Sequence, residues 1–417
     1  MILRKSQIMN IPQGYKQTEL GIIPKDWEVI SIKERGCLVK DGINPMLSPN
    51  VSFWEYSMPA FDNGKQPTLS LGEEMHSNRT IIRDTVLLFN KLNVRQQRVW
   101  FVESPSVDSV CSMEFLPYVS KSINLEFLFH YLKTDVVTDY FNGISKGTSN
   151  SQKRITPQDF LDYKVILPPI AEQRAIAEAL SDVDGLIAAL DKKIAKKRLL
   201  KQGAMQQLLT GKKRLPGFTD KWVEITFGEY VDIYRGGSPR PIESYITDSP
   251  NGVNWIKIGD VKPNDKYINK TEERIIPDGV SRSRRVDVGD FILSNSMSFG
   301  RPYILGIDGC IHDGWLVIQN YHNSFDKDYL YYLLCSEDVM MQYIGMAAGS
   351  SVKNLNKEKV ASLQLCVPTT IEEQQAIATI LSDMDKEIAD LEAQRDKYRL
   401  LKSGMMQKLL TGQIRLK

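Results

Sequence analysis

A segment of 46 residues occurs twice in this chain, and the two copies start 201 residues apart. Residues 170–215 read IAEQRAIAEALSDVDGLIAALDKKIAKKRLLKQGAMQQLLTGKKRL, and residues 371–416 read IEEQQAIATILSDMDKEIADLEAQRDKYRLLKSGMMQKLLTGQIRL. Of the 46 aligned positions, 27 are identical without a gap, far more than a helix-favouring composition gives by chance. The regions before the two copies share much less. A nearly constant segment behind two divergent ones favours a binding module that keeps its geometry and varies what it contacts.

Each copy has the apolar spacing of a coiled coil, with large apolar residues in alternating steps of four and three. We expect these stripes to form the interface between the helices or with a partner. The stripe residues are Ile176, Leu180, Val183, Ile187 and Leu190 in the first copy, and Ile377, Leu381, Met384, Ile388 and Leu391 in the second. Basic residues then interrupt the stripes, at Lys197 and Lys201 and at Arg395 and Lys402. Because a long single helix is marginal alone, we expect the two helices to pack antiparallel on each other.

Both halves of the chain repeat one order of elements. Each opens with a polar lead-in to a tryptophan, Trp27 or Trp222, followed by a short strand and by further β-like runs between turn residues. Helices are predicted over 125–141 and 329–344, and shorter ones start at Thr156 and Asn356. The predicted fold class is α+β: two globular domains of mixed α/β structure, related by an approximate two-fold, joined by two long helices in an antiparallel coiled coil. The predicted boundaries are 1–168 and 212–368 for the domains, and 169–211 and 369–417 for the helical segments.

The composition is that of a soluble globular protein, with 42% apolar and 25% charged residues. Because the net charge is only +2, any affinity for a polyanion must come from local patches. The five cysteines show no CxxC spacing, which favours reduced thiols. No stretch approaches 18 apolar residues, and the first residues contain no apolar core of a signal peptide. We therefore expect a cytoplasmic protein with no membrane contact.

Motifs of nucleotide, methyl-donor and nuclease chemistry are absent from the sequence. No GxxxxGK[ST] loop is present, the double proline at 168–169 lacks the flanking residues that amino-methyltransferases use, and Pro277-Asp278 is not followed by Glu-x-Lys. Cys310 and His312 could be two metal ligands, but no second pair has suitable spacing, so a buried or loop histidine is favoured. We expect no catalytic residue, no metal and no cofactor in this chain.

Polar and basic loops recur at matching places in both halves. Arg, Asn and Gln side chains read base edges in the major groove, and basic residues beside a helix N-terminus contact phosphates. The candidate DNA-binding residues of the first half are Lys91, Asn93, Arg95, Gln96, Gln97, Arg98, Lys146, Asn150, Gln152, Lys153 and Arg154. Those of the second half are Arg235, Arg240, Arg282, Arg284, Arg285, Asn295, Arg301, Lys353 and Asn354. For any single residue a solvated loop is an equal alternative; the recurrence of the set favours double-stranded DNA. The basic run over 192–201 is interpreted instead as a solvated helical face, because the second copy lacks most of it.

The repeated motifs resemble a known family. LPPIAEQRAIAEALSDVD with KQGAMQQLLTG, and IEEQQAIATILSDMD with KSGMMQKLLTG, are similar to the conserved regions of type I restriction-modification specificity subunits, and YKQTELGIIPKDWEV is similar to the usual start of that family. The resemblance implies two target-recognition domains in inverted orientation, each reading one half of a split, asymmetric DNA site. It implies that the helices set the gap between the halves and form a coiled coil.

The same resemblance implies partners that carry the chemistry. Two modification subunits, which bind S-adenosylmethionine and methylate adenine N6, would dock on the helical regions. Motor and nuclease subunits would complete the restriction enzyme, so ATP and magnesium are expected on partner subunits. Two alternatives remain open from the sequence: a coiled-coil scaffold with two protein-binding domains and no DNA role, and a self-contained DNA enzyme with degenerate motifs.

Overall fold

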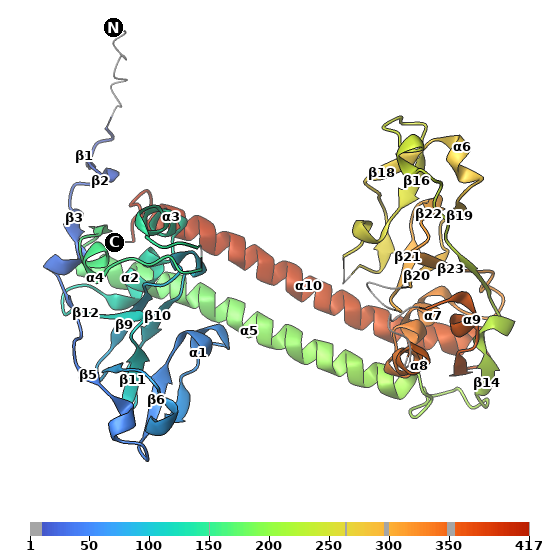
Figure 1. The fold of residues 1–417 in the computed structure, drawn as a ribbon, viewed down its shortest axis with the longest axis horizontal. Coiled ribbons are helices and arrows are strands. Elements are labelled where there is room, and N and C mark those ends of the chain that lie inside the picture. The colour runs from blue at the N-terminus through green and yellow to red at the C-terminus, as the bar shows by residue number, and fades with distance from the viewer. Residues whose placement is uncertain (1–10, 150, 263–264, 296–299, 348–354, 417) are drawn as a thin grey trace, which may run out of the picture. The chain divides into compact units, whose positions relative to one another are not determined.

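The computed structural model describes residues 11–149, 151–262, 265–295, 300–347 and 355–416. Contacts divide the chain into two compact units, which we call unit 1 (Met1–Leu190 and Gln394–Lys417) and unit 2 (Asp191–Ala393). Both boundaries fall inside the two long helices, α5 (Ile170–Leu208) and α10 (Ile371–Leu409). Each unit therefore contains one globular domain, the first half of the helix that follows it and the second half of the other helix (Figure 1).

Unit 1 is built on two larger sheets, beside two sheets of two strands each. Its strands are β1 (Tyr15–Thr18), β2 (Gly21–Pro24), β3 (Glu28–Ser31), β4 (Cys37–Leu38), β5 (Gly42–Ile43), β6 (Ser52–Tyr56), β7 (Thr68–Leu71), β8 (Arg79–Ile81), β9 (Val86–Asn90), β10 (Val99–Val102), β11 (Ser109–Ser112), β12 (Phe115–Val119) and β13 (Lys164–Leu167), and its shorter helices are α1 (Met58–Asp62), α2 (Leu125–Leu132), α3 (Asp135–Ile144) and α4 (Pro157–Leu161). One sheet has the order β10-β9-β12-β4 and is antiparallel. The other has the order β5-β8-β11-β6-β7, in which β11 and β6 run parallel.

Unit 2 repeats this plan. Its strands are β14 (Val223–Thr226), β15 (Asp232–Arg235), β16 (Val253–Ile256), β17 (Tyr267–Ile268), β18 (Glu273–Ile275), β19 (Arg284–Val286), β20 (Phe291–Ser294), β21 (Pro302–Leu305), β22 (Gly309–Ile311), β23 (Trp315–Gln319) and β24 (Gln364–Val367), and its shorter helices are α6 (Pro277–Val280), α7 (Lys327–Leu334), α8 (Glu337–Ala347) and α9 (Lys357–Ala361). The sheets have the orders β15-β23-β20-β21-β17 and β18-β16-β22-β19, and β16 and β22 again run parallel. Strands β15, β23, β20 and β21 thus correspond to β4, β12, β9 and β10 of unit 1.

The main apolar core of each unit includes residues of both long helices. In unit 1, Ile176 and Leu180 of α5 belong to one buried cluster with Leu409 of α10 and with Phe127 and Tyr131 of α2. In unit 2, the corresponding cluster joins Ile377 and Leu381 of α10 to Leu208 of α5. The Leu-Leu pair near the end of each repeat is therefore a core component of the other domain, which explains why both copies retain it. The long helices thereby join domains that are remote in sequence.

The helix prediction needs one correction in each half. The predicted helix over 125–141 is two helices, α2 and α3, and the predicted helix over 329–344 is likewise α7 and α8. Thr134 takes an extended backbone (φ −73°, ψ 150°), and the Ser336 hydroxyl accepts a hydrogen bond from the Val339 amide at 3.3 Å. The Ser336 side chain thus caps the start of α8, whereas the Thr134 hydroxyl donates to the Tyr131 carbonyl at 2.9 Å and makes no cap to α3.

Other expectations about elements are confirmed. The strands after Trp27 and Trp222 are β3 and β14, which pair with β13 and β24 in front of the long helices. The short helices α4 and α9 begin after their predicted caps, since Thr156 and Asn356 each accept a hydrogen bond from a backbone amide three residues on. Within the ranges that the structure describes, no helix combines the length and the apolar character needed to cross a bilayer.

Candidate DNA interface and helix junctions

In unit 1, a buried carboxylate at the start of α5 binds the segment that follows α10. Glu172, only 4% exposed, accepts a hydrogen bond from the indole Nε1 of Trp27 at 3.0 Å. It also accepts two hydrogen bonds from the Arg415 guanidinium, both at 2.7 Å. Arg415 in turn binds Asp26 at 2.7 Å. A buried charge is tolerated when a cation and further donors satisfy it, and Glu172 meets both conditions.

Unit 2 contains the same junction built from the other copy. Glu373 accepts two hydrogen bonds from Arg214, at 2.7 and 2.9 Å, and one from Nε1 of Trp222 at 3.3 Å. Both tryptophans were recognised in the sequence only as markers of the lead-in. Their partners explain why Glu near the start and Arg near the end of the 46-residue segment are retained: each junction needs one residue from each copy.

The glutamine after each of these glutamates is also a junction residue. Gln173 accepts a hydrogen bond from the Asn124 amide in front of α2 at 2.9 Å and donates to the Pro168 carbonyl at 2.7 Å. Gln374 makes the corresponding bonds to the Asp326 amide in front of α7, at 2.8 Å, and to the Pro368 carbonyl, at 3.3 Å. The repeated Glu-Gln pair therefore orients the domain on its helix.

The lysines that interrupt the apolar stripes form ion pairs between the helices. Lys402 binds Asp184 at 2.6 Å in unit 1, and Lys201 binds Asp385 at 2.5 Å in unit 2. Lys197 adds a pair to Glu387 at 2.7 Å. From Lys197 to Lys201 the partner moves back from Glu387 to Asp385, which is the pattern of antiparallel helices. Of the predicted stripe residues, Val183, Ile388 and Leu391 are buried, whereas Ile187, Leu190 and Met384 are half-buried.

The residue of the globular domain that faces these helix ion pairs differs between the units. Tyr332 of α7 donates its hydroxyl hydrogen to Asp385 at 2.7 Å. The corresponding residue of α2 is His130, whose Nε2 lies 3.1 Å from the Ser181 hydroxyl, which itself donates to Glu126 at 2.5 Å. Burial, with the charge of Lys402, lowers the pKa of His130 to about 3. The ring is therefore neutral and donates from Nε2, because the serine hydrogen is already engaged.

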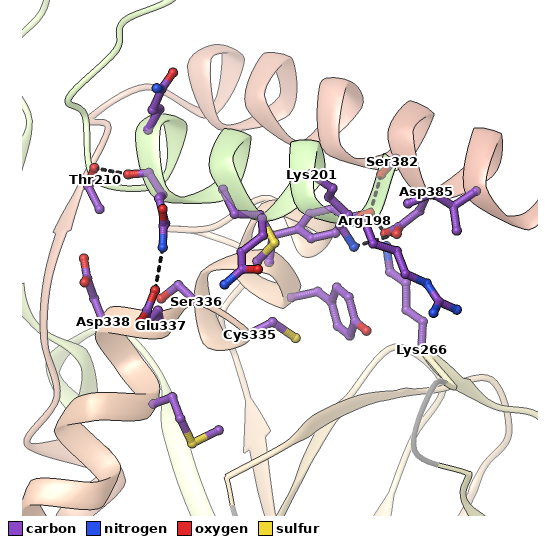
Figure 2. Close-up of a pocket in the computed structure, with 18 of the residues that line it drawn as sticks. Arg198, Lys201, Thr210, Lys266, Cys335, Ser336, Glu337, Asp338, Ser382 and Asp385 are labelled. Atoms are coloured by element: carbon purple, nitrogen blue, oxygen red, sulfur yellow. Dashed lines mark hydrogen bonds and ion pairs between the residues drawn. The ribbon is translucent and has the colours of Figure 1, made fainter. Parts of the chain in front are cut away.

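A groove of about 1400 Å³ lies in unit 2 between α5, α10 and the α7–α8 pair (Figure 2). Its cations are largely matched by acids: Arg198 pairs with Glu392, Lys201 with Asp385, and Lys266 with Asp328 at 2.7 Å. The candidate DNA-binding residue Arg301 lines this groove, with its guanidinium carbon 5.8 Å from the centroid of the Tyr303 ring. Because acids already neutralise these cations, the lining does not favour a phosphate.

Two of the candidate DNA-binding loops of unit 1 lie side by side. The Asn93 amide donates to the Lys153 carbonyl at 2.8 Å, and the Ile155 amide donates to the Lys91 carbonyl at 3.1 Å. Lys146 and Arg154 form an isolated bridge in the same place. The exposed candidates of this paired loop are Arg95, Gln96, Lys146, Gln152 and Arg154. Asn150 lies outside the described residues.

Three candidates in these loops already have partners within unit 1. Arg98 makes two hydrogen bonds to Asp62, at 2.8 and 2.7 Å, and Arg154 makes two to Glu114, at 3.2 and 3.0 Å. Gln97 donates to the Thr138 hydroxyl at 2.9 Å. An arginine whose guanidinium already donates two hydrogen bonds to a carboxylate has fewer donors left for a base edge. These three side chains are therefore better suited to shaping the loop than to reading bases.

Unit 2 brings four predicted arginines onto one surface, which we call the arginine face: Arg235, Arg240, Arg282 and Arg284. The Ser283 hydroxyl donates to the Gly237 carbonyl at 2.7 Å, and Arg284 Nε donates to the Arg235 carbonyl at 3.4 Å. Gly236 permits this close approach, because a Cβ there would meet the His312 carbonyl at 2.1 Å.

Asp313 lies at the centre of the arginine face. Its carboxylate accepts from the Ser238 hydroxyl at 2.9 Å and from Arg240 at 3.5 Å. Its carbonyl accepts from Arg235 at 3.3 Å and from Asn295 at 3.1 Å. Asn295 is thus adjacent to the face, whereas Lys353 and Asn354 lie outside the described residues. Arg285, the neighbour of Arg284, is exposed and lies 3.8 Å from Asp287.

Sequence reasoning missed three residues of this surface. Tyr234 lies under Arg284, with the guanidinium carbon 4.9 Å from the ring centroid, and Tyr245 lies under Arg282 at 5.6 Å. Asp313 is the third. These pairings join different strands and loops, so no local sequence signal reveals them.

Among the described residues no cluster of three or more His, Cys, Asp or Glu could hold a metal, and His312 Nδ1 accepts a hydrogen bond from the Gly314 amide at 2.9 Å.

Equivalent junctions and unlike exposed loops define a duplicated protein whose two domains share their attachment to the long helices and differ in their exposed loops. The model of the type I restriction modification DNA specificity domain matches residues 98–197 and 219–398. The chain therefore belongs to the type I restriction-modification DNA specificity family. This assignment confirms the expectation of a specificity subunit with DNA specificity domains and disfavours the scaffold without a DNA role.

Individual relatives agree with this assignment. The putative type I restriction enzyme MjaX specificity subunit of Methanocaldococcus jannaschii is 27% identical over 433 residues, covering 97% of this chain and 97% of the relative. The MjaVIII specificity subunit of the same organism is 25% identical over 438 residues with the same coverage.

Two solved structures share the fold. A chain from a structure on complex assembly and conformational transition of the type I R-M system aligns with a TM-score of 0.63 and 20% identity, over 94% of this chain and 99% of that chain. The type I S subunit from M. genitalium aligns with a TM-score of 0.58 and 14% identity, over 92% of this chain and 96% of that chain.

Proposed function

We propose that units 1 and 2 each read one half of a bipartite, asymmetric DNA site, and that α5 and α10 set the gap between the halves. The observation that carries this proposal is the contrast between repeated and divergent residues. The junction residues Glu172 and Arg415 recur as Glu373 and Arg214 with the same bonds. The exposed candidates do not recur: unit 1 presents lysine, glutamine and Arg95, with which no carboxylate of the described residues pairs, and unit 2 presents the arginine face. Different donors read different bases.

Exposed leucines on the repeated segment support two equivalent sites for a partner. Leu199 and Leu200 of α5 are 69% and 50% exposed, and the corresponding Leu400 and Leu401 of α10 are 76% and 50% exposed. Burial within the chain does not account for retaining both pairs. Exposed apolar residues of this kind mark protein contacts. We assign each pair to one modification subunit, giving two copies per chain.

Catalysis in this proposal belongs to the partners. The modification subunits bind S-adenosylmethionine and methylate adenine, and motor and nuclease subunits that use ATP and magnesium join them for restriction. The chain itself contributes recognition and geometry. Its place of action is the cytoplasm, where the host DNA and these partners meet.

The test is reconstitution with the modification subunit of the same host. We expect methylation of a bipartite motif by the complex, and no methyl transfer by the chain alone. In native mass spectrometry, Leu200→Glu and Leu401→Glu should each reduce the bound modification subunits from two to one, while the exposed control Glu178→Gln retains two. Methylation by the isolated chain, or full binding by both leucine variants, would contradict the proposal.

A further inference from the structure

Arg284 is held by two contacts that leave the end of its side chain available. It begins β19, the edge strand of its sheet, and its guanidinium carbon lies 4.9 Å from the ring centroid of Tyr234 on β15. Its Nε donates to the Arg235 carbonyl at 3.4 Å. The two terminal nitrogens remain free for a ligand, because no carboxylate of the described residues pairs with Arg284. The side chain is exposed.

Other arginines of the candidate interface lack this combination. Arg98 and Arg154 are engaged by carboxylates through two nitrogens each. Arg240 lies beside Asp313 at 3.5 Å and is 82% exposed. Arg282 stacks on Tyr245, and within the described residues its guanidinium makes no hydrogen bond to the backbone. Arg284 thus combines an oriented guanidinium with the lack of a carboxylate partner among the described residues.

An oriented guanidinium suits one ligand in the major groove. Its two terminal N–H groups match the O6 and N7 acceptors of guanine, whereas adenine presents a donor in place of O6. Stacking on an aromatic ring and a bond from Nε restrict the side chain before binding, so less rotamer freedom is lost in the complex. The Tyr234 ring provides this restriction, and Gly236, two residues further on, lets the β15 loop approach β22.

We propose that Arg284 reads a guanine in the half-site recognised by unit 2, and that Tyr234 is the residue that positions it. This inference rests on the proposed function, namely that unit 2 reads one half-site. It adds a particular base to be read and a residue that the sequence did not indicate.

The test compares three variants of the chain in complex with its modification subunits. Each complex methylates a library of random DNA, and sequencing gives the preference at every position. Arg284→Lys keeps the charge and loses the planar guanidinium with its two terminal N–H donors. We therefore expect the preference for guanine at one position to fall about tenfold or more. Tyr234→Leu should relax the same position to a smaller extent. Arg274→Lys, at an exposed arginine on β18 at the other edge of the same sheet, is the matched control and should leave the motif unchanged.

Each outcome has a defined meaning. Relaxation confined to one guanine, with the other half-site and the gap unchanged, supports the inference. An intact motif with Arg284→Lys, or relaxation at a base other than guanine, would overturn it while the bipartite function stands. An unchanged motif with Tyr234→Leu would remove the positioning role. If the wild-type complex yields no bipartite motif, the proposed function itself fails.

Discussion

The ammonium nitrogen of Lys402 lies 2.6 Å from a carboxylate oxygen of Asp184, which is 218 residues earlier in the chain. Lys201 repeats this bond with Asp385 in unit 2. Both lysines fall where the apolar stripe of the helix is interrupted. A polar residue in such a stripe lowers stability but fixes the register of two helices. The interruption of the stripe is therefore a means of alignment, because the pair can form in one register only.

The Lys402–Asp184 pair should show measurable coupling. Lys402 is 13% exposed in this pair, so removing one partner leaves the other poorly solvated. We expect Lys402→Met to lower the free energy of unfolding by about 1–2 kcal/mol, and Asp184→Leu to restore part of that loss in the double variant. Urea unfolding of the single and double variants measures the coupling, with Lys397→Met as an exposed control. Additive effects would show that the pair does not contribute.

The Glu172 junction should be more sensitive than any exposed position on the same helix. Glu172→Gln removes the charge that Arg415 and Trp27 share, and we expect a loss of about 2–3 kcal/mol. Glu178→Gln, six residues further along α5 and exposed, should change stability by less than about 0.5 kcal/mol. Hydrogen exchange of residues 412–416 should accelerate only in the first variant. Equal behaviour of the two variants would refute the assigned role of Glu172.

His130 should make the stability of unit 1 depend on pH. Burial lowers its pKa to about 3 in the folded state, while the unfolded value is near 6.5. Between these values the unfolded chain binds a proton that the folded chain does not, so stability is full above pH 6.5 and falls as the pH falls toward 3. At pH 5 the loss is about 2 kcal/mol.

The variant His130→Tyr copies Tyr332 from the other unit and removes this titration. Its stability should therefore fall less than that of the wild type between pH 7.5 and pH 5. Thermal melting of both proteins at the two pH values measures the difference. Parallel curves would show that His130 is not held neutral by its burial.

Two arginines of one loop should behave differently toward DNA. Arg95 is exposed, and its Nε donates to the nearby Asn93 side chain at 3.3 Å, whereas Arg98 binds Asp62 through two nitrogens. We expect Arg95→Ala to alter the preference at one half-site with little change in melting temperature. Arg98→Ala should lower the melting temperature by several degrees, because Asp62 loses its partner. Methylated-motif sequencing and melting of both variants test this, and the reverse pattern would exclude the assignment.

Much of the fold was accessible from the sequence because it depends on local periodicity. The stripe from Ile176 to Leu190 predicts the first long helix, and Thr156 predicts the start of α4. The break after Leu132 was missed, because apolar residues continue at helical spacing across Thr134. The junction residues Glu172 and Arg415 also gave no signal, since a charged residue on a helix is usually solvated.

The candidate interface was accessible only in part. The basic loops could be recognised by composition, so Arg95 and Arg284 were identified. The sequence could not show which of these arginines pair with a carboxylate, because partners such as Asp62 come from distant segments. Tyr234 was missed for the same reason: its contact with Arg284 depends on how two strands of different sheets are placed.

The most direct test of the account lengthens both helices and asks what changes in the DNA motif. Seven residues, one heptad, inserted after Leu190 and again after Gln394 keep the Lys402–Asp184 and Lys201–Asp385 registers and add about 10 Å of helix. Sequencing of methylated DNA from the complex should show a gap longer by about three base pairs, with both half-sites unchanged. Altered half-site sequences, or an unchanged gap in an active complex, would contradict the separation between reading and spacing.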